Sequence, residues 1–133
     1  MKISTSIFRY IEHELYNYEE TKRELKNCKE NIINETIIPD VPTKGAIGDS
    51  TASKAIKLTT SNYILQMERV IKAIDKSLAL LSDTHRDLFK LKYMDCLTLK
   101  EVYLEMNISK RSYYRIRREL IKTVGQQLGL IRI

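Results

Sequence analysis

Six basic side chains close together near the C-terminal end are the residues whose types and spacing could do chemistry. Between Ser109 and Val124 there are six Lys or Arg residues against a single acid, Glu119. The charge of the whole chain follows the same trend. Its net charge is +6, and residues 85–133 alone hold eleven basic against five acidic residues, while the charges of the two preceding segments cancel. This charge asymmetry predicts that the C-terminal end binds a polyanion, most simply nucleic acid.

The order of these residues on a predicted helix suits double-stranded DNA. The major groove admits an α-helix, and Arg or Lys can hydrogen-bond to guanine there. Tyr113, Ile116 and Leu120 repeat at intervals of three and four, so we expect them to face the core. The residues expected to read bases are Lys110, Arg111, Ser112, Tyr114 and Arg115. Those expected to hold phosphates are Ser109, Arg117, Arg118 and Lys122. For Arg117, next to the buried stripe, an intramolecular ion pair is an equal alternative.

Three short helices are expected to position these side chains in a domain at residues 82–133. Ser82 and Asp83 signal the start of a helix over residues 84–93. Thr98 and Glu101 have the capping-box spacing for a helix over residues 99–106. After a short turn, Ser109 can cap a last helix that reaches about residue 128. Two short helices joined by such a turn, the second strongly basic, predict a helix-turn-helix.

The first part of the chain is expected to be helical too, which makes the fold all-α. A long helix over residues 6–34, in a segment 1–36, carries one narrow apolar stripe. A linker over residues 37–58 holds both prolines and two of the four glycines. A second long helix over residues 60–81, in a segment 59–81, has apolar residues spaced 3, 4, 3, 4 and 3, as in a coiled coil: Ile64, Met67, Ile71, Ile74, Leu78 and Leu81.

This apolar seam leaves two arrangements open, and both could hold together. It could pack against the first helix as an antiparallel hairpin within one chain. It could also form a homodimer or a higher homo-oligomer through the helices over residues 6–34 and 60–81.

The remaining inventory argues against an enzyme. The chain has no Gly-rich phosphate loop, no HExxH and no GxSxG. Cys28 and Cys96 are expected to be small buried hydrophobes, and with His13 and His85 they form no zinc pattern. His85 is expected to be solvated. We expect no cofactor, no metal and no catalytic residue. No apolar run reaches the roughly 20 residues of a membrane span, and no secretion signal is recognisable, which predicts a cytoplasmic protein.

Three stretches of the last third resemble region 4 of bacterial sigma factors. They are residues 81–93, residues 97–102 and Ile108-Ser109-Lys110-Arg111-Ser112-Tyr113-Tyr114-Arg115. The resemblance covers about residues 78–128. The chain length, the helix and linker ahead of this region and the run Tyr114-Arg115-Ile116-Arg117-Arg118 are similar to phage late-gene activators of the RinA and ArpU type.

This resemblance implies a transcriptional activator of phage packaging, morphogenesis and lysis genes, acting in the bacterial host on DNA and with RNA polymerase. The DNA-reading roles transfer to the outward residues Lys110, Arg111, Ser112, Tyr114, Arg115 and Arg118.

Two other functions compete with this one. A phage small terminase subunit would bind packaging-site DNA as a ring, although such subunits usually place the helix-turn-helix first. A helical adaptor or anti-sigma protein would not contact DNA at all.

Overall fold

All regular structure in the described part of the chain is helical, which confirms the all-α prediction. The computed structural model describes residues 3–37 and 50–132. In chain order the elements are α1 (Thr5–Tyr16), α2 (Tyr18–Ile37), α3 (Ser50–Leu80), α4 (Asp83–Leu88), the π-helical η2 (Phe89–Met94), α5 (Leu99–Glu105) and α6 (Lys110–Gln127).

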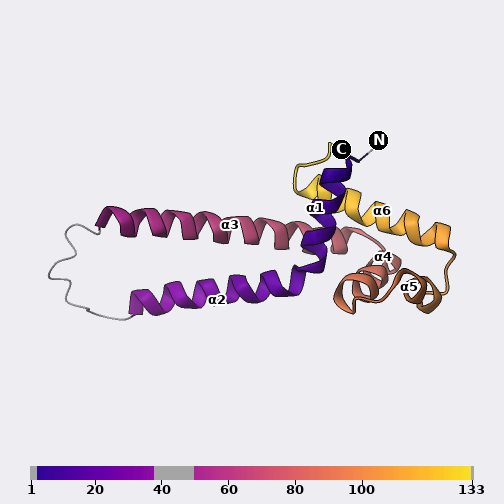
Figure 1. Cartoon of the computed structure of the whole chain (residues 1–133), viewed down its shortest axis with the longest axis horizontal. Coiled ribbons are helices and arrows are strands. Elements are labelled where there is room, and N and C mark those ends of the chain that lie inside the picture. The colour runs from indigo at the N-terminus through magenta and orange to yellow at the C-terminus, as the bar shows by residue number, and fades with distance from the viewer. Residues whose placement is uncertain (1–2, 38–49, 133) are drawn as a thin grey trace.

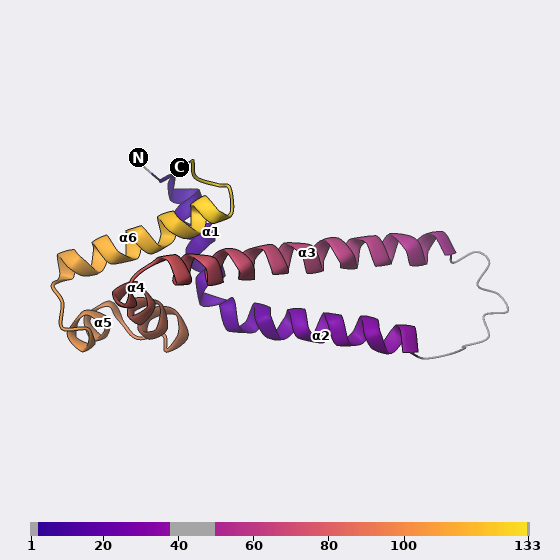
Figure 2. The same ribbon diagram turned by 180° about the vertical axis from the view of Figure 1, so that it is seen from behind.

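The molecule consists of a long helical hairpin and a compact end. Helices α2 and α3 run antiparallel and side by side, while α1, α4, α5 and α6 gather around the far end of α3 (Figures 1 and 2). The start of α1 and the end of α6 both lie in this compact end. Contacts at two levels hold the hairpin: Tyr18 donates a hydrogen bond to Asp75, and Lys29 Nζ lies 2.7 Å from Glu68 Oε1.

The first predicted helix is in fact two helices, so the expectation of one continuous helix over residues 6–34 was wrong. The break is at Asn17, whose backbone N–H and side-chain amide both donate to the carbonyl of His13, at 3.1 and 3.0 Å. An Asn side chain that bonds to nearby backbone in this way favours a helix end. The break lets the two halves take different partners, because α1 packs on α6 and η2 whereas α2 packs on α3.

The apolar seam of α3 packs within the chain. Ile64, Met67 and Ile71 are buried and Ile74 is fully buried, while Leu78 is half-buried. The intramolecular hairpin is therefore the arrangement that the structure contains. Helix α3 begins at Ser50 rather than near residue 60, so residues 50–58 of the predicted linker are helical. The rest of that linker, residues 38–49, lies outside the described residues.

A single core joins α1 to the C-terminal helices. Ile11 and Leu15 of α1 are fully buried in the same cluster as Leu88 of α4, Val102 of α5 and Leu120 of α6. Gly125 of α6 permits the close approach, because a Cβ there would lie 2.4 Å from the Ile131 side chain and 3.0 Å from that of Ile11. The C-terminal helices therefore share their core with the N-terminal one.

The predicted helix over residues 84–93 is α4 followed by η2, whose wider π-helical turn was not predicted. The two helices predicted after residue 98 are confirmed as α5 and α6, to within a residue at each end.

The expectation that both cysteines are buried was wrong, since Cys96 is exposed and Cys28 half-buried. Cys96 lies in the connection to α5 with a positive φ of 55°, so it is part of a turn rather than of the core.

Candidate nucleic-acid interface

The N-terminal cap of α5 and the turn between α5 and α6 hold α6 at a fixed position. Thr98 and Glu101 form the expected capping box: the Glu101 N–H donates to Thr98 Oγ1 at 3.3 Å, and the Thr98 backbone N–H donates to Glu101 Oε1 at 3.4 Å. Asn107 takes a positive φ of 55°, which reverses the chain. Ile108 then donates its N–H to the Tyr103 carbonyl at 3.0 Å and packs against the core.

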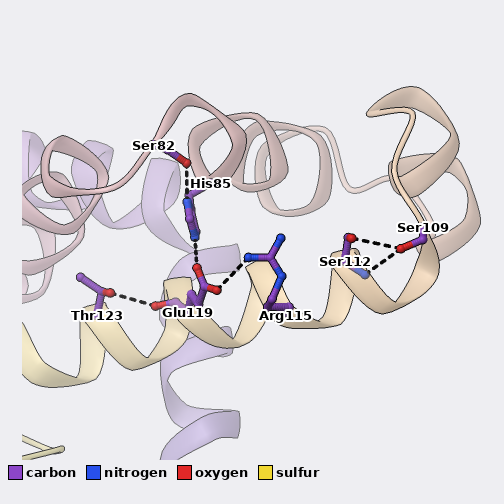
Figure 3. A network of polar contacts seen from close by, with 7 residues as sticks. All are labelled: Ser82, His85, Ser109, Ser112, Arg115, Glu119 and Thr123. Carbon is purple, nitrogen blue, oxygen red and sulfur yellow. Dashed lines mark hydrogen bonds and ion pairs between the residues drawn. The ribbon is translucent and has the colours of Figure 1, made fainter.

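The N-terminus of α6 is capped by Ser109, as predicted. The Ser109 side chain accepts a hydrogen bond from the Ser112 N–H at 3.1 Å, and its hydroxyl donates to the Ser112 hydroxyl at 3.0 Å (Figure 3). The first turn of a helix carries unpaired N–H groups and partial positive charge, which favour an anion. The two serines therefore lie at a helix N-terminus, the kind of position at which N–H groups donate hydrogen bonds to a phosphate.

Helix α6 separates its apolar and basic residues between two faces. The expected core residues Tyr113, Ile116 and Leu120 are buried, with Tyr113 only 1% exposed. The opposite side exposes Lys110, Arg111, Tyr114, Arg115, Arg118 and Lys122. Among the described residues, Lys110, Arg111 and Lys122 have no hydrogen-bond or ion-pair partner. Their charges are therefore available to an external anion.

Arg115 is exposed but held within the chain. Its Nη1 donates to Glu119 Oε1 at 3.1 Å, and the other carboxylate oxygen of Glu119 lies 2.7 Å from Nε2 of His85 (Figure 3). The expectation that His85 is solvated was wrong, because it is only 8% exposed. Its Nδ1 lies 2.8 Å from the Ser82 hydroxyl oxygen at the start of α4. A line of polar contacts thus joins α4 to the outer face of α6.

Arg117 takes the intramolecular alternative. Its Nη2 and Nε donate to the two carboxylate oxygens of Glu12 at 2.8 and 3.0 Å, and its guanidinium lies 4.7 Å from the centre of the Phe8 ring. Tyr93 also donates to Glu12, at 2.8 Å. Because the ion pair of Glu12 and Arg117 is half-buried between α1 and α6, the Arg117 side chain is not part of the exposed basic face.

Glu12 is charged in this environment. Burial would raise the pKa of its carboxyl, but hydrogen bonds from Arg117 and Tyr93 and the nearby positive charges outweigh burial and hold the pKa below its ordinary value. The same pair raises the pKa of Arg117, against the effect of burial. The ion pair therefore fastens α1 to α6 at neutral pH.

Sequence reasoning missed His85 and Glu12 as residues that support α6. A signal for His85 was present, since it lies three residues after Ser82 and a helix brings residues at that spacing together. The isolated acid Glu119 in a basic stretch was a second signal. No local signal pointed to Glu12, which lies 105 residues from its partner Arg117.

In residues 3–37 and 50–132, no group of three or more His, Cys, Asp or Glu is arranged to hold a metal ion. No helix in these ranges is both long and apolar enough to cross a membrane.

Two comparisons with known proteins each match most of the chain. A family model described as "Protein of unknown function (DUF722)" matches residues 10–126, which reach from α1 almost to the end of α6. The chain is 26% identical over 134 residues to the transcriptional activator rinA of Staphylococcus phage phi11. That alignment covers 97% of this chain and 94% of the phage protein. No solved structure matches the chain significantly.

Proposed function

The chain belongs to the DUF722 family, and from this premise we propose that it is a sequence-specific DNA-binding regulator of transcription. Its activity is activation of phage late genes for packaging, morphogenesis and lysis. It acts in the cytoplasm of the bacterial host, with double-stranded DNA and RNA polymerase as partners. It has no catalytic activity and needs no cofactor. The near full-length similarity to a phage transcriptional activator supports this function.

One observation carries the proposal: α6 follows α5 after a short turn, begins at a capped N-terminus and has a basic exposed face. A helix-turn-helix has this order of elements, and its second helix enters the major groove. Lys110, Arg111 and Arg115 lie in the first two turns, within reach of base edges. Ser109, Arg118 and Lys122 flank them and are assigned to phosphates.

Ser112 and Tyr114 complete the proposed reading surface. Ser112 lies in the first turn beside Ser109, and the Tyr114 side chain is 44% exposed with its ring against that of Tyr113. The Tyr114 hydroxyl is assigned to a phosphate or to the edge of a thymine.

A salt titration tests whether the protein binds DNA electrostatically. The affinity of the full chain for a labelled random-sequence duplex is measured by fluorescence anisotropy over a series of salt concentrations. We expect the logarithm of the affinity to fall linearly with the logarithm of the salt concentration. The Lys122→Ala variant should reduce the slope by about 1, as expected for the loss of one phosphate contact. A helical adaptor or anti-sigma protein predicts no binding, and that result would overturn the proposal.

The mass of the protein in solution separates the regulator from a small terminase subunit. A packaging ring would contain many copies, whereas a regulator that reads a promoter is a monomer or a small closed oligomer. In the structure, the buried residues of the α3 seam pack within the chain. Any homodimer would therefore use the outer faces of the helices in residues 6–34 and 60–81.

A further inference from the structure

Glu119 is the one acidic side chain in the basic stretch from Ser109 to Val124, and both of its carboxylate oxygens have partners within the chain. A carboxylate on a surface that meets DNA repels phosphate and so lowers the affinity for every sequence. Its presence on this helix therefore needs a reason other than general DNA affinity.

The contacts of Glu119 supply one. One oxygen accepts a hydrogen bond from Arg115 Nη1 at 3.1 Å, and the other lies 2.7 Å from His85 Nε2 (Figure 3). Since a carboxylate only accepts, Nε2 of His85 carries the proton that is shared with it. His85 is itself buried, with its second ring nitrogen 2.8 Å from the Ser82 hydroxyl oxygen. His85 thus holds the Glu119 carboxylate from the core side, and the carboxylate holds the Arg115 guanidinium in turn.

We propose that Glu119, backed by His85, is a positioning residue that sets the DNA sequence preference by orienting Arg115. This inference rests on the proposed function. A guanidinium has five N–H donors, and Glu119 uses one of those on Nη1, which leaves the others for the acceptors of a guanine. An Arg side chain that is already ordered loses less conformational freedom when it binds.

The negative charge and the positioning of Arg115 act differently on the two affinities. Repulsion between the carboxylate and the phosphates lowers the affinity for every sequence alike. The orientation of Arg115 raises only the affinity for a duplex that carries the right base. The positioning of Arg115, rather than the repulsion, therefore widens the ratio between specific and general affinity.

The test compares two labelled duplexes. One is recovered from a randomised library by selection on the wild-type full chain, and the other has the same composition in shuffled order. The ratio of the two affinities is the sequence preference. For Glu119→Gln, which removes the charge, we expect the shuffled duplex to bind more tightly and the preference to fall about 3- to 10-fold. Arg115→Ala should lower the preference as well, and adding Glu119→Gln to it should change the preference no further.

Two further variants separate positioning from charge and from folding. Glu105→Gln is the matched control, since Glu105 is an exposed residue of α5 with no ion-pair partner among the described residues. It should raise both affinities equally. Glu119→Asp keeps the charge but is too short to reach both Arg115 and His85, so it should lower the preference without any gain on the shuffled duplex. Thermal unfolding of each variant by circular dichroism identifies any that is not folded.

The outcomes distinguish this inference from the function on which it rests. If Glu119→Gln and Glu119→Asp both keep the wild-type preference, the positioning role is wrong while DNA reading stands. If Glu119→Gln raises both affinities equally, as Glu105→Gln is expected to do, the role is equally wrong. If the wild-type chain itself shows no preference, the proposed function fails and the inference fails with it.

Discussion

The cations of α6 are not equivalent, because some are already paired within the chain and others are not. Lys110, Arg111 and Lys122 lack partners among the described residues, Arg115 is bonded to Glu119, and Arg117 is bonded to Glu12. Position along the helix divides them further, since the first two turns are the part that reaches base edges in a helix-turn-helix. Their substitutions should therefore have different effects on DNA binding.

Replacement of Arg111 or Arg115 by Ala should weaken binding to the preferred sequence by about 1–3 kcal/mol and relax the preference at one base pair. Replacement of Lys122 should weaken binding to all sequences alike, because phosphates are the same in every sequence. Anisotropy titrations against matched and mismatched duplexes measure both effects. Equal losses from the three variants on every duplex would contradict the division into base readers and phosphate contacts.

The ion pair of Glu12 and Arg117 should make stability depend on pH in a defined direction. The folded state holds the pKa of Glu12 below its ordinary value of 4.5. The contribution of the pair is therefore fully present above that value and lost as the pH falls through the folded-state pKa. Glu12→Gln should lower the free energy of unfolding at neutral pH, and the difference from wild type should shrink in acid. Urea unfolding at about pH 7 and about pH 3 measures this. A difference that is the same at both would contradict the role of the charge.

At the scale of elements, capping decides where α6 begins and what its first turn presents. Ser109→Ala removes the side-chain acceptor of the Ser112 N–H and should cost about 0.5–2 kcal/mol of stability. Ser109→Asp should keep stability near the wild-type value, because Asp is a good N-cap, yet weaken DNA binding through its negative charge. Denaturation and anisotropy on the two variants separate folding from binding. Unchanged DNA affinity for Ser109→Asp would show that this end of α6 does not approach phosphate.

The elements that could be predicted from sequence are those with local signals. The capping box at Thr98 and Glu101 and the cap at Ser109 are contained within four consecutive residues each, and both occur as expected. The break at Asn17 was missed because the apolar stripe continues across it in sequence while its two halves pack on different helices. The start of α3 was missed because the polar residues from Ser50 onward carry no apolar periodicity.

At the scale of the whole molecule, buried residues of the α3 seam pack within one chain. Ile74 is fully buried in the core that joins α1, α3 and α6. Ile74→Ala should therefore lower the free energy of unfolding by about 2–5 kcal/mol. The midpoint of unfolding should not depend on protein concentration, as it would for an obligate dimer. Circular dichroism melts over a wide range of concentrations measure this, and a midpoint that rises with concentration would contradict an in-chain seam.

The packing of α1 against α6 could not be predicted from sequence. Glu12 and Arg117 each have several possible partners of opposite charge, and only the packing of α1 on α6 selects this pair. The exposed face of α6 was predictable for the opposite reason, since the periodicity of Tyr113, Ile116 and Leu120 assigns the core side and leaves the basic residues outside. Helix faces follow from periodicity, whereas contacts between distant helices follow from the fold.

The central claim is that the basic face of α6 reads DNA sequence, and a selection from genomic DNA tests it most directly. Fragmented host and phage DNA is bound to the purified full chain at near-physiological salt, beside a variant with both Arg111 and Arg115 replaced by Ala. The account predicts enrichment of one or a few promoter-proximal fragments by the wild-type chain and loss of that enrichment in the variant. Uniform recovery of all fragments, or none, would contradict it.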